Sequence, residues 1–158
     1  MLLAYRVPRV PSTPRIAIWR KLRALGVAQI GDGLVALPDD ARTREQLEWL
    51  AGDVDAAGGS AILWRGELLS AADEQRLVAQ LQEARAEEYR ALVAQVEQTS
   101  TDLTKERGRA VERLRRELRR IRRRDYFPPA EQELTRAAIE SLARRDRAAT
   151  PTPSGELI

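Results

Sequence analysis

The chain has 158 residues and a formal net charge of +3 at neutral pH, and it contains neither cysteine nor histidine. This composition excludes disulfides, thiolate nucleophiles, histidine catalysis and the usual zinc ligands. The isoelectric point of about 9.8 is high because almost all of the cations are arginine, so the distribution of arginine along the chain is more informative than its total.

Apolar runs in the sequence are short. None approaches the roughly 20 residues needed to span a bilayer, and the first one ends at Pro8 without the features of a signal peptide. We therefore expect a soluble, cytoplasmic protein with no membrane partner. The length suits one domain with a sizeable core plus an appendage.

Residues 1–68 predict a small domain that mixes strands and helices. Apolar alternation and helical spacing predict strands at 2–7, 27–30, 34–37 and 60–65 and helices at 14–25 and 43–57. The strand at 34–37 is apolar throughout, so we expect it at the centre of the sheet. The right-handed crossover rule makes a ferredoxin-like βαββαβ sandwich of class α+β the economical arrangement. Both helices then cover one sheet face, and the other face is solvated or covered by a second copy or by the rest of the chain.

Cap and turn residues support these boundaries. Ser12–Pro14 has the pattern of an N-cap followed by proline in the first helical turn, and Gly26 is the expected C-cap. The Asp32–Gly33 pair is a strong hairpin signal. Thr43 with Gln46 three residues later predicts a capping box for the second helix.

The chain then predicts a helical extension at residues 70–147, which contains an α-hairpin, and a disordered tail at 148–158. Helical spacing predicts helices at 70–98, 102–124 and 130–147. The first of them is acidic, because acidic residues outnumber arginines by seven to three between residues 67 and 98. The tail is too polar and too rich in proline to pack.

The helix predicted at 102–124 carries the strongest charge run in the chain. Its apolar seam has the spacing of helix–helix packing and consists of Val111, Leu114, Leu118 and Ile121. The cations around the seam are the predicted DNA-binding residues, namely Arg113, Arg115, Arg116, Arg119, Arg120, Arg122, Arg123 and Arg124.

Three interpretations of these arginines stay open. As a DNA contact they suit phosphate neutralisation better than base recognition. As an internal element they pair weakly with the acidic helix around Glu83, Glu87 and Glu88. As a solvated face they reflect codon usage alone.

A second candidate site is an anion site at the start of the first helix. It combines two hydroxyls, the free N–H groups of a helix start and three nearby guanidinium groups, which suits a chromate or phosphate group. The predicted anion-binding residues are Arg6, Arg9, Ser12, Thr13 and Arg15. The alternative is an ordinary N-cap with solvated arginines.

Three segments carry a family resemblance: AYRVPRVPSTPRIAIWRKLRALGVAQIGDGLVALP, TREQLEWLAGDVDAAGGSAILW, and the arginine-rich stretch that ends in RRRDYF. The chain resembles the N-terminal domain of ChrB-type chromate-resistance regulators over residues 2–147. The first half of the chain is also similar, more weakly, to the sandwich domain of PaaX-type repressors and to ferredoxin-like nucleases of the CRISPR adaptation machinery.

The ChrB resemblance implies a cytoplasmic homodimer that binds the promoter DNA of a chromate-efflux operon and responds to chromate. Regulators of this type are expected to carry a further C-terminal domain. The alternative function is a non-catalytic dimeric scaffold, whose basic helix pairs with its own acidic helix or with a partner domain.

The weaker resemblance to nucleases does not extend to their catalytic residues. Such enzymes place a carboxylate at the end of the first strand to hold a divalent cation, whereas this chain has Tyr5–Val7 there. Asp32, Asp39 and Asp40 fit turn and cap positions instead. We therefore expect no catalytic residue, no metal and no cofactor. The aromatic residues Trp19, Trp49 and Trp64 are expected in the core or at an interface.

Overall fold

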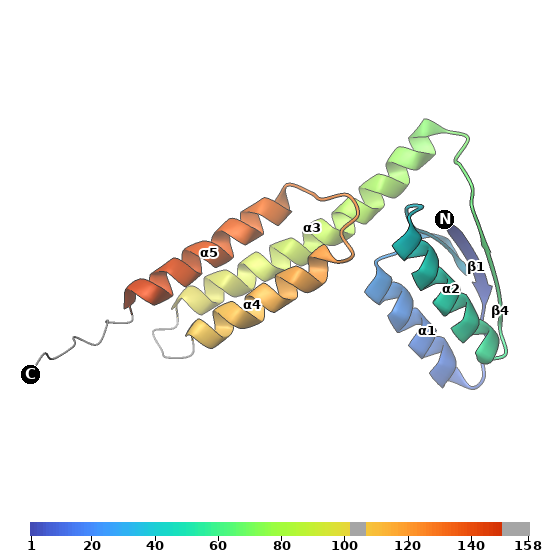
Figure 1. The fold of residues 1–158 in the computed structure, drawn as a ribbon, viewed down its shortest axis with the longest axis horizontal. Helices are drawn as coiled ribbons and strands as arrows, with labels where there is room; N and C mark the ends of the chain where they lie inside the picture. Colours follow the sequence, from blue (N-terminus) through green and yellow to red (C-terminus); the bar gives the residue numbers. More distant parts are fainter. Residues whose placement is uncertain (102–106, 150–158) are drawn as a thin grey trace, which may run out of the picture. The chain divides into compact units, whose positions relative to one another are not determined.

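The computed structural model describes residues 1–101 and 107–149, which form a four-stranded antiparallel sheet and five helices (Figure 1). The elements are β1 (Leu2–Arg6), α1 (Ser12–Leu25), β2 (Ala28–Gly31), β3 (Leu34–Ala36), α2 (Ala41–Ala56), β4 (Ser60–Trp64), α3 (Ala71–Thr101), α4 (Arg107–Arg122) and α5 (Glu131–Ala149). They fall into two compact units. The sheet unit comprises Met1–Gln82 with Arg124–Phe127, and the helical unit comprises the described residues of Glu83–Arg123 and Pro128–Ile158.

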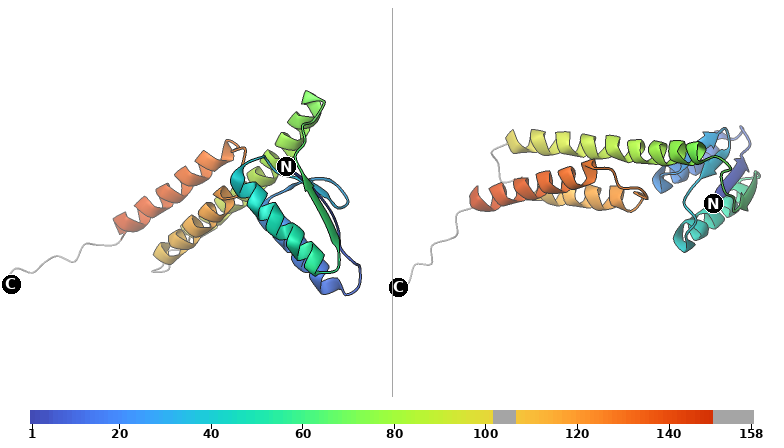
Figure 2. Two further views of the ribbon diagram at one scale, coloured as in Figure 1. Left: turned by 45° about the vertical axis from the view of Figure 1, so that its right-hand side comes forward. Right: turned by 90° about the horizontal axis from the view of Figure 1, so that it is seen from above.

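The sheet of the first unit has the strand order β2-β3-β1-β4. β1 lies inside it, with Leu3 opposite Val35 of β3 on one side and opposite Leu63 of β4 on the other. β3 pairs with both β1 and β2, which confirms its predicted interior position. α1 and α2 lie side by side on one face of the sheet (Figures 1 and 2).

The core of the sheet unit forms between these two helices and the sheet. Leu3 and Val35 are fully buried on the sheet face that the helices cover. The helices contribute residues at spacings of three and four, which keep one face of each helix on the sheet: Ile18, Leu22, Leu47, Leu50 and Val54.

The tryptophans of the two helices are not core residues. Trp19 is 52% exposed and Trp49 is 73% exposed. Trp19 directly follows the core residue Ile18, and Trp49 directly precedes the core residue Leu50. Because a helix turns by about 100° per residue, each ring points away from the sheet. The core position was therefore wrong for both, and a position at an interface stays a prediction. Trp64, on β4, is 38% exposed.

Both helix starts differ from their predicted caps. α1 begins at Ser12, two residues before the predicted start, with Pro11 at the N-cap and no side chain capping it. In α2 the capping box is formed by Asp40 and Thr43, whose side chains each accept the other's backbone N–H, at 2.8 and 3.1 Å. Asp40 is among the best N-cap residues, and it displaces the predicted box of Thr43 with Gln46. The predicted C-cap is confirmed, because Gly26 has a φ of 70°.

The helical unit packs the second half of α3 against α4 and α5 (Figure 1). The predicted seam of α4 is confirmed, because all four of its residues are buried in this core. The other members of the core come from α3 and α5: Tyr89, Leu92, Val96, Ile139, Leu142 and Ala143. Thr135 is buried with them, and its hydroxyl donates to the carbonyl of Glu131 at 2.7 Å.

The helix boundaries in the second half differ slightly from prediction. Of the helix predicted at 102–124, the structure describes 107–122 as α4, and residues 102–106 lie outside the described residues. α5 runs to Ala149, so residues 148 and 149 are helical rather than part of a tail, as suits two alanines. The remainder of the predicted tail, 150–158, lies outside the described residues. None of the helices in the described residues is long and apolar enough to cross a membrane.

Candidate functional site

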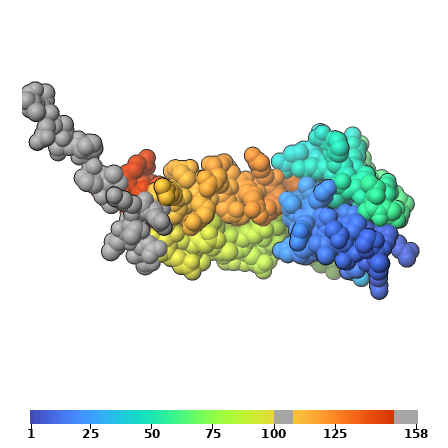
Figure 3. Space-filling view, turned by 90° about the horizontal axis from the view of Figure 1, so that it is seen from below, coloured from blue at the N-terminus to red at the C-terminus, as the bar shows by residue number. Residues whose placement is uncertain are grey.

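α4 separates apolar and cationic side chains onto opposite faces. Its buried seam of Val111, Leu114, Leu118 and Ile121 faces the core of the helical unit. Directly opposite, at steps of four and three residues, lie four exposed arginines, and a fifth follows in the turn after α4. We term these five the arginine stripe: Arg109, Arg113, Arg116, Arg120 and Arg123. At 1.5 Å per residue the stripe extends over about 21 Å along the helix. Figure 3 shows α4, in orange, at the surface.

Few carboxylates neutralise the stripe. Arg120 pairs with Glu117 at 3.6 Å, and beside the stripe Arg115 pairs with Glu112 at 2.7 Å. Within the described part of the chain, Arg109, Arg113 and Arg116 have no ion pair. These guanidinium groups therefore present their charge and their hydrogen-bond donors to solvent.

The other predicted arginines lie beside the stripe or away from it. Arg119 and Arg122 are exposed on one flank of α4. Arg122 is close enough to Glu133 of α5 to act on its carboxyl group, whose pKa is lowered chiefly by a hydrogen bond from Arg136 and further by the charges of both arginines. Arg124 is half-buried and belongs to the sheet unit. Four of the eight predicted DNA-binding residues thus lie on the stripe, namely Arg113, Arg116, Arg120 and Arg123.

Two of the acidic residues proposed as internal partners have a partner on their own helix. Glu83 pairs with Arg90, which also pairs with Glu131 of α5 at 2.8 Å. Glu88 pairs with Arg85 at 3.3 Å. These carboxylates of α3 therefore pair with other arginines and not with Arg109, Arg113 or Arg116 of α4.

The predicted anion site is only partly assembled. Arg6, Arg9 and Arg15 line one cavity of about 580 Å³, which we term the arginine pocket, and within the described residues none of the three has an ion pair. Ser12 and Thr13 lie in the exposed first turn of α1, outside the lining of this cavity. Arg6 ends β1, Arg9 lies in the bend that follows, and Arg15 belongs to the start of α1.

The remaining walls of the arginine pocket are aromatic and polar, with Tyr5, Trp19, Gln29 and Asp32 among them. Burial raises the pKa of Tyr5, and the negative charge of Asp32 raises it further. Tyr5 is therefore a neutral phenol at physiological pH. The pocket far exceeds the roughly 30 Å³ of a water molecule, so it has room for an anion that keeps part of its hydration.

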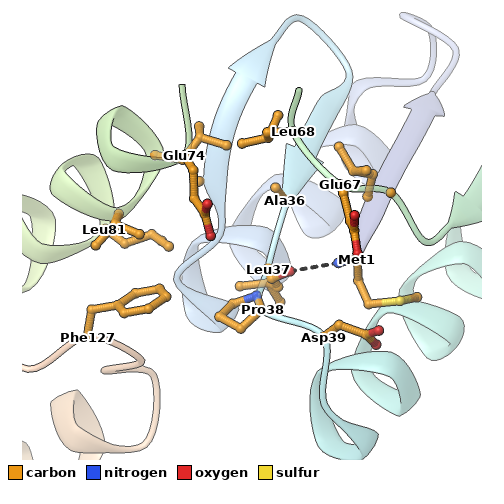
Figure 4. Close-up of a pocket in the computed structure, with 15 residues that line it drawn as sticks. Met1, Ala36, Leu37, Pro38, Asp39, Glu67, Leu68, Glu74, Leu81 and Phe127 are labelled. Atoms are coloured by element: carbon orange, nitrogen blue, oxygen red, sulfur yellow. Dashed lines mark hydrogen bonds between the residues drawn. The ribbon is translucent and has the colours of Figure 1, made fainter. Parts of the chain in front are cut away.

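A second pocket, of about 420 Å³, has the opposite charge (Figure 4). Its walls are apolar, with Ala36, Leu81 and Phe127 among them, and Glu67 and Glu74 also line it. These carboxylates disfavour an anion. Nothing in the sequence pattern predicted this pocket. Within the described residues, no group of three or more acidic side chains is placed to hold a metal ion.

One member of the arginine stripe is absent from the predicted set. Arg109 precedes Arg113 by four residues and Arg116 by seven, so helical spacing places it on the same face. The sequence contained this signal, but the predicted charge run began at Arg113. Counting steps of three and four from the known members would have found it.

Comparison with known proteins gives the family. The family model described as "Protein ChrB, N-terminal" matches residues 15–149. The chain is 30% identical over 132 residues to Protein ChrB of Cupriavidus metallidurans, a match that covers 81% of this chain and 40% of that relative. The chain thus spans well under half the length of that relative. No solved structure matches it significantly. On the strength of the family match, this chain belongs to the ChrB N-terminal family.

Proposed function

We propose that this protein is a cytoplasmic regulator of a chromate-resistance operon and that it binds promoter DNA through the arginine stripe of α4. The proposal joins the family membership with one observation, the exposed line of arginines opposite a buried seam. We further assign the sheet unit to the ferredoxin-like class, which the strand order β2-β3-β1-β4 supports.

The geometry of the stripe favours a long polyanion as its ligand. Its five exposed arginines lie along α4 and the turn that follows it over about 21 Å, which is about six base pairs of duplex DNA. Guanidinium groups bind phosphates through paired hydrogen bonds. The stripe offers cations without the asparagine or glutamine side chains that read bases, so it fits backbone contact and register more than sequence recognition.

The response to chromate is assigned to the arginine pocket of the sheet unit. Chromate is a tetrahedral dianion, and three guanidinium groups in one cavity provide the charge and the donors to hold it. Ser12 and Thr13 are left out of this site. Two copies of the chain are proposed to act together on the promoter.

A mobility-shift experiment with a matched control tests the DNA contact. Arg109, Arg113 and Arg116 are changed together to Gln, which keeps helix propensity and breaks no ion pair within the described residues. The control changes Arg144, Arg145 and Arg147 of α5 to Gln. These residues are also exposed, so the control removes the same charge from the same unit.

The expected result is a loss of affinity for promoter DNA of about tenfold or more in the stripe variant, with little change in the control. Equal loss in both variants would mean that only net charge matters. If the wild-type chain binds no duplex at all, the alternative of a non-catalytic dimeric scaffold is favoured.

A further inference from the structure

The two edges of the sheet differ in how well they are protected. β2, at one edge, is only four residues long, and its pairing with β3 is irregular between Gln29 and Gly31. The side-chain amide of Gln80 also donates to the backbone carbonyl of Gln29 at 3.4 Å. Short strands, irregular pairing and cover by a neighbouring element are the devices by which proteins keep a sheet edge from pairing with another chain.

β4, at the other edge, shows none of these devices in the part of the chain that the structure describes. All five of its residues, Ser60–Trp64, pair in regular antiparallel register with β1. The strand contains no proline and no charged residue. Within the described residues β1 is its only partner strand, so its outer row of backbone groups is open.

The side chains of β4 make this edge apolar as well as open. Ile62 is 67% exposed and Trp64 is 38% exposed, on the sheet face away from α1 and α2. They line a shallow hollow together with Ala4 and Leu34 of the neighbouring strands, and Arg6 and Asp32 also line it. An exposed, regular and apolar edge strand is a site where another strand adds.

We propose that β4 pairs with β4 of a second copy of this chain, antiparallel and centred on Ile62. A two-fold axis at that point sets Ile62 opposite Ile62 of the second copy, and Trp64 opposite its Ser60. The largest side chain of the strand thus meets a small one. No like charges face each other along the strand, and the apolar hollows of the two copies join into one strip.

This inference rests on the proposal that the protein acts as a homodimer, and it names the surface. Its tests use no DNA, so their outcome is separate from the fate of the DNA proposal. The sequence contains no cysteine, so an introduced cysteine is the only thiol in each chain.

The first test is cross-linking of the full chain with Ile62→Cys under mild oxidation. Directly opposite residues of antiparallel strands have Cβ atoms about 4.5–5.5 Å apart, close to the span of a disulfide. We expect most of the protein to form a covalent dimer. The control is Trp49→Cys on α2, which is at least as exposed and is expected to stay uncrosslinked.

A mixing experiment tests the register. Ser60→Cys and Trp64→Cys chains are expected to cross-link when mixed in equal amounts and not when each is oxidised alone. Cross-linking of Trp64→Cys alone would instead indicate that the two sheets meet face to face, and it would overturn the edge pairing.

Sedimentation supplies a measurement without thiols. The wild-type chain is expected to be a dimer, and Ile62→Arg is expected to be a monomer with an unchanged circular dichroism spectrum, since the side chain lies outside the core. Trp49→Arg should remain a dimer. A dimer that survives Ile62→Arg would overturn this surface but keep the homodimer, and a wild-type monomer would overturn both.

Discussion

The two groups of arginines in this protein form surfaces of different shape. Both groups are exposed, and both include members with no ion pair in the described residues. In the arginine pocket of the sheet unit, Arg6, Arg9 and Arg15 converge on one cavity of about 580 Å³. In the arginine stripe of α4, five guanidinium groups follow one another along a helix. The pocket fits a small anion, and the stripe fits a long one.

The difference has its origin in the backbone that carries each group. A strand end followed by a bend and a helix start brings side chains from separate turns together, which makes a concave site. A helix that packs through one seam directs its other side chains outward, and together they form a convex surface. The same residue type can therefore serve two ligand classes in one chain.

The largest effect is expected from removing the support behind the stripe. Leu114 is fully buried in the core of the helical unit. Leu114→Ala should lower the free energy of unfolding by about 2–5 kcal/mol, because it leaves a cavity. Denaturation followed by circular dichroism measures the change. Leu134→Ala, at a position 65% exposed on α5, should have almost no effect, and equal losses would contradict the assigned core.

The pocket and the stripe should be separable by mutation. Changing Arg6, Arg9 and Arg15 together to Gln should weaken binding of chromate or sulfate by about tenfold or more, since charge-assisted hydrogen bonds are lost. Calorimetric titration measures this binding. Affinity for DNA should change little in the same variant. If DNA binding falls as far as it does in the stripe variant, the two groups are not distinct sites.

The smallest effect concerns Tyr5, which lines the pocket. Burial and the charge of Asp32 raise its pKa above 10.0, the ordinary value for tyrosine. The folded state therefore holds the phenolic proton more tightly than the unfolded state, and this stabilisation is complete below pH 10 and lost as the pH rises through the folded pKa. Ultraviolet titration should show a late ionisation that is absent in Tyr5→Phe and shifted to lower pH in Asp32→Asn. An unshifted Asp32→Asn curve would contradict the second cause.

Local patterns in the sequence predicted most of the elements. Gly26 ended the first helix because its left-handed φ needs no Cβ, and the seam of α4 followed from spacing alone. The N-cap of α2 was misplaced because Asp40 and Thr43 satisfy each other, and such a reciprocal pair competes with the equally plausible Thr43 with Gln46. Trp19 and Trp49 lie outside the core because helical angle, and not hydrophobic character alone, decides which side chains face the sheet.

The sites were less accessible from sequence than the elements. Four of the five stripe residues belong to the predicted set, because one helix fixes its own periodicity. That set missed Arg109 and also contained four arginines off the stripe, namely Arg115, Arg119, Arg122 and Arg124. The pocket needed knowledge of how the chain bends between β1 and α1, which decides that Arg15 turns into the cavity and that Ser12 stays outside its lining. The edge proposed for pairing depends on strand order, which no single strand encodes.

The most direct test of the central claim is the salt dependence of DNA binding. If the stripe contacts phosphates, the slope of log affinity against log salt concentration should be shallower by about 2 to 3 in the variant with Arg109, Arg113 and Arg116 changed to Gln. Each lost phosphate contact removes about 0.9 from this slope. The α5 control, with Arg144, Arg145 and Arg147 changed to Gln, should keep the wild-type slope. Identical slopes for the wild type and the stripe variant would contradict the account.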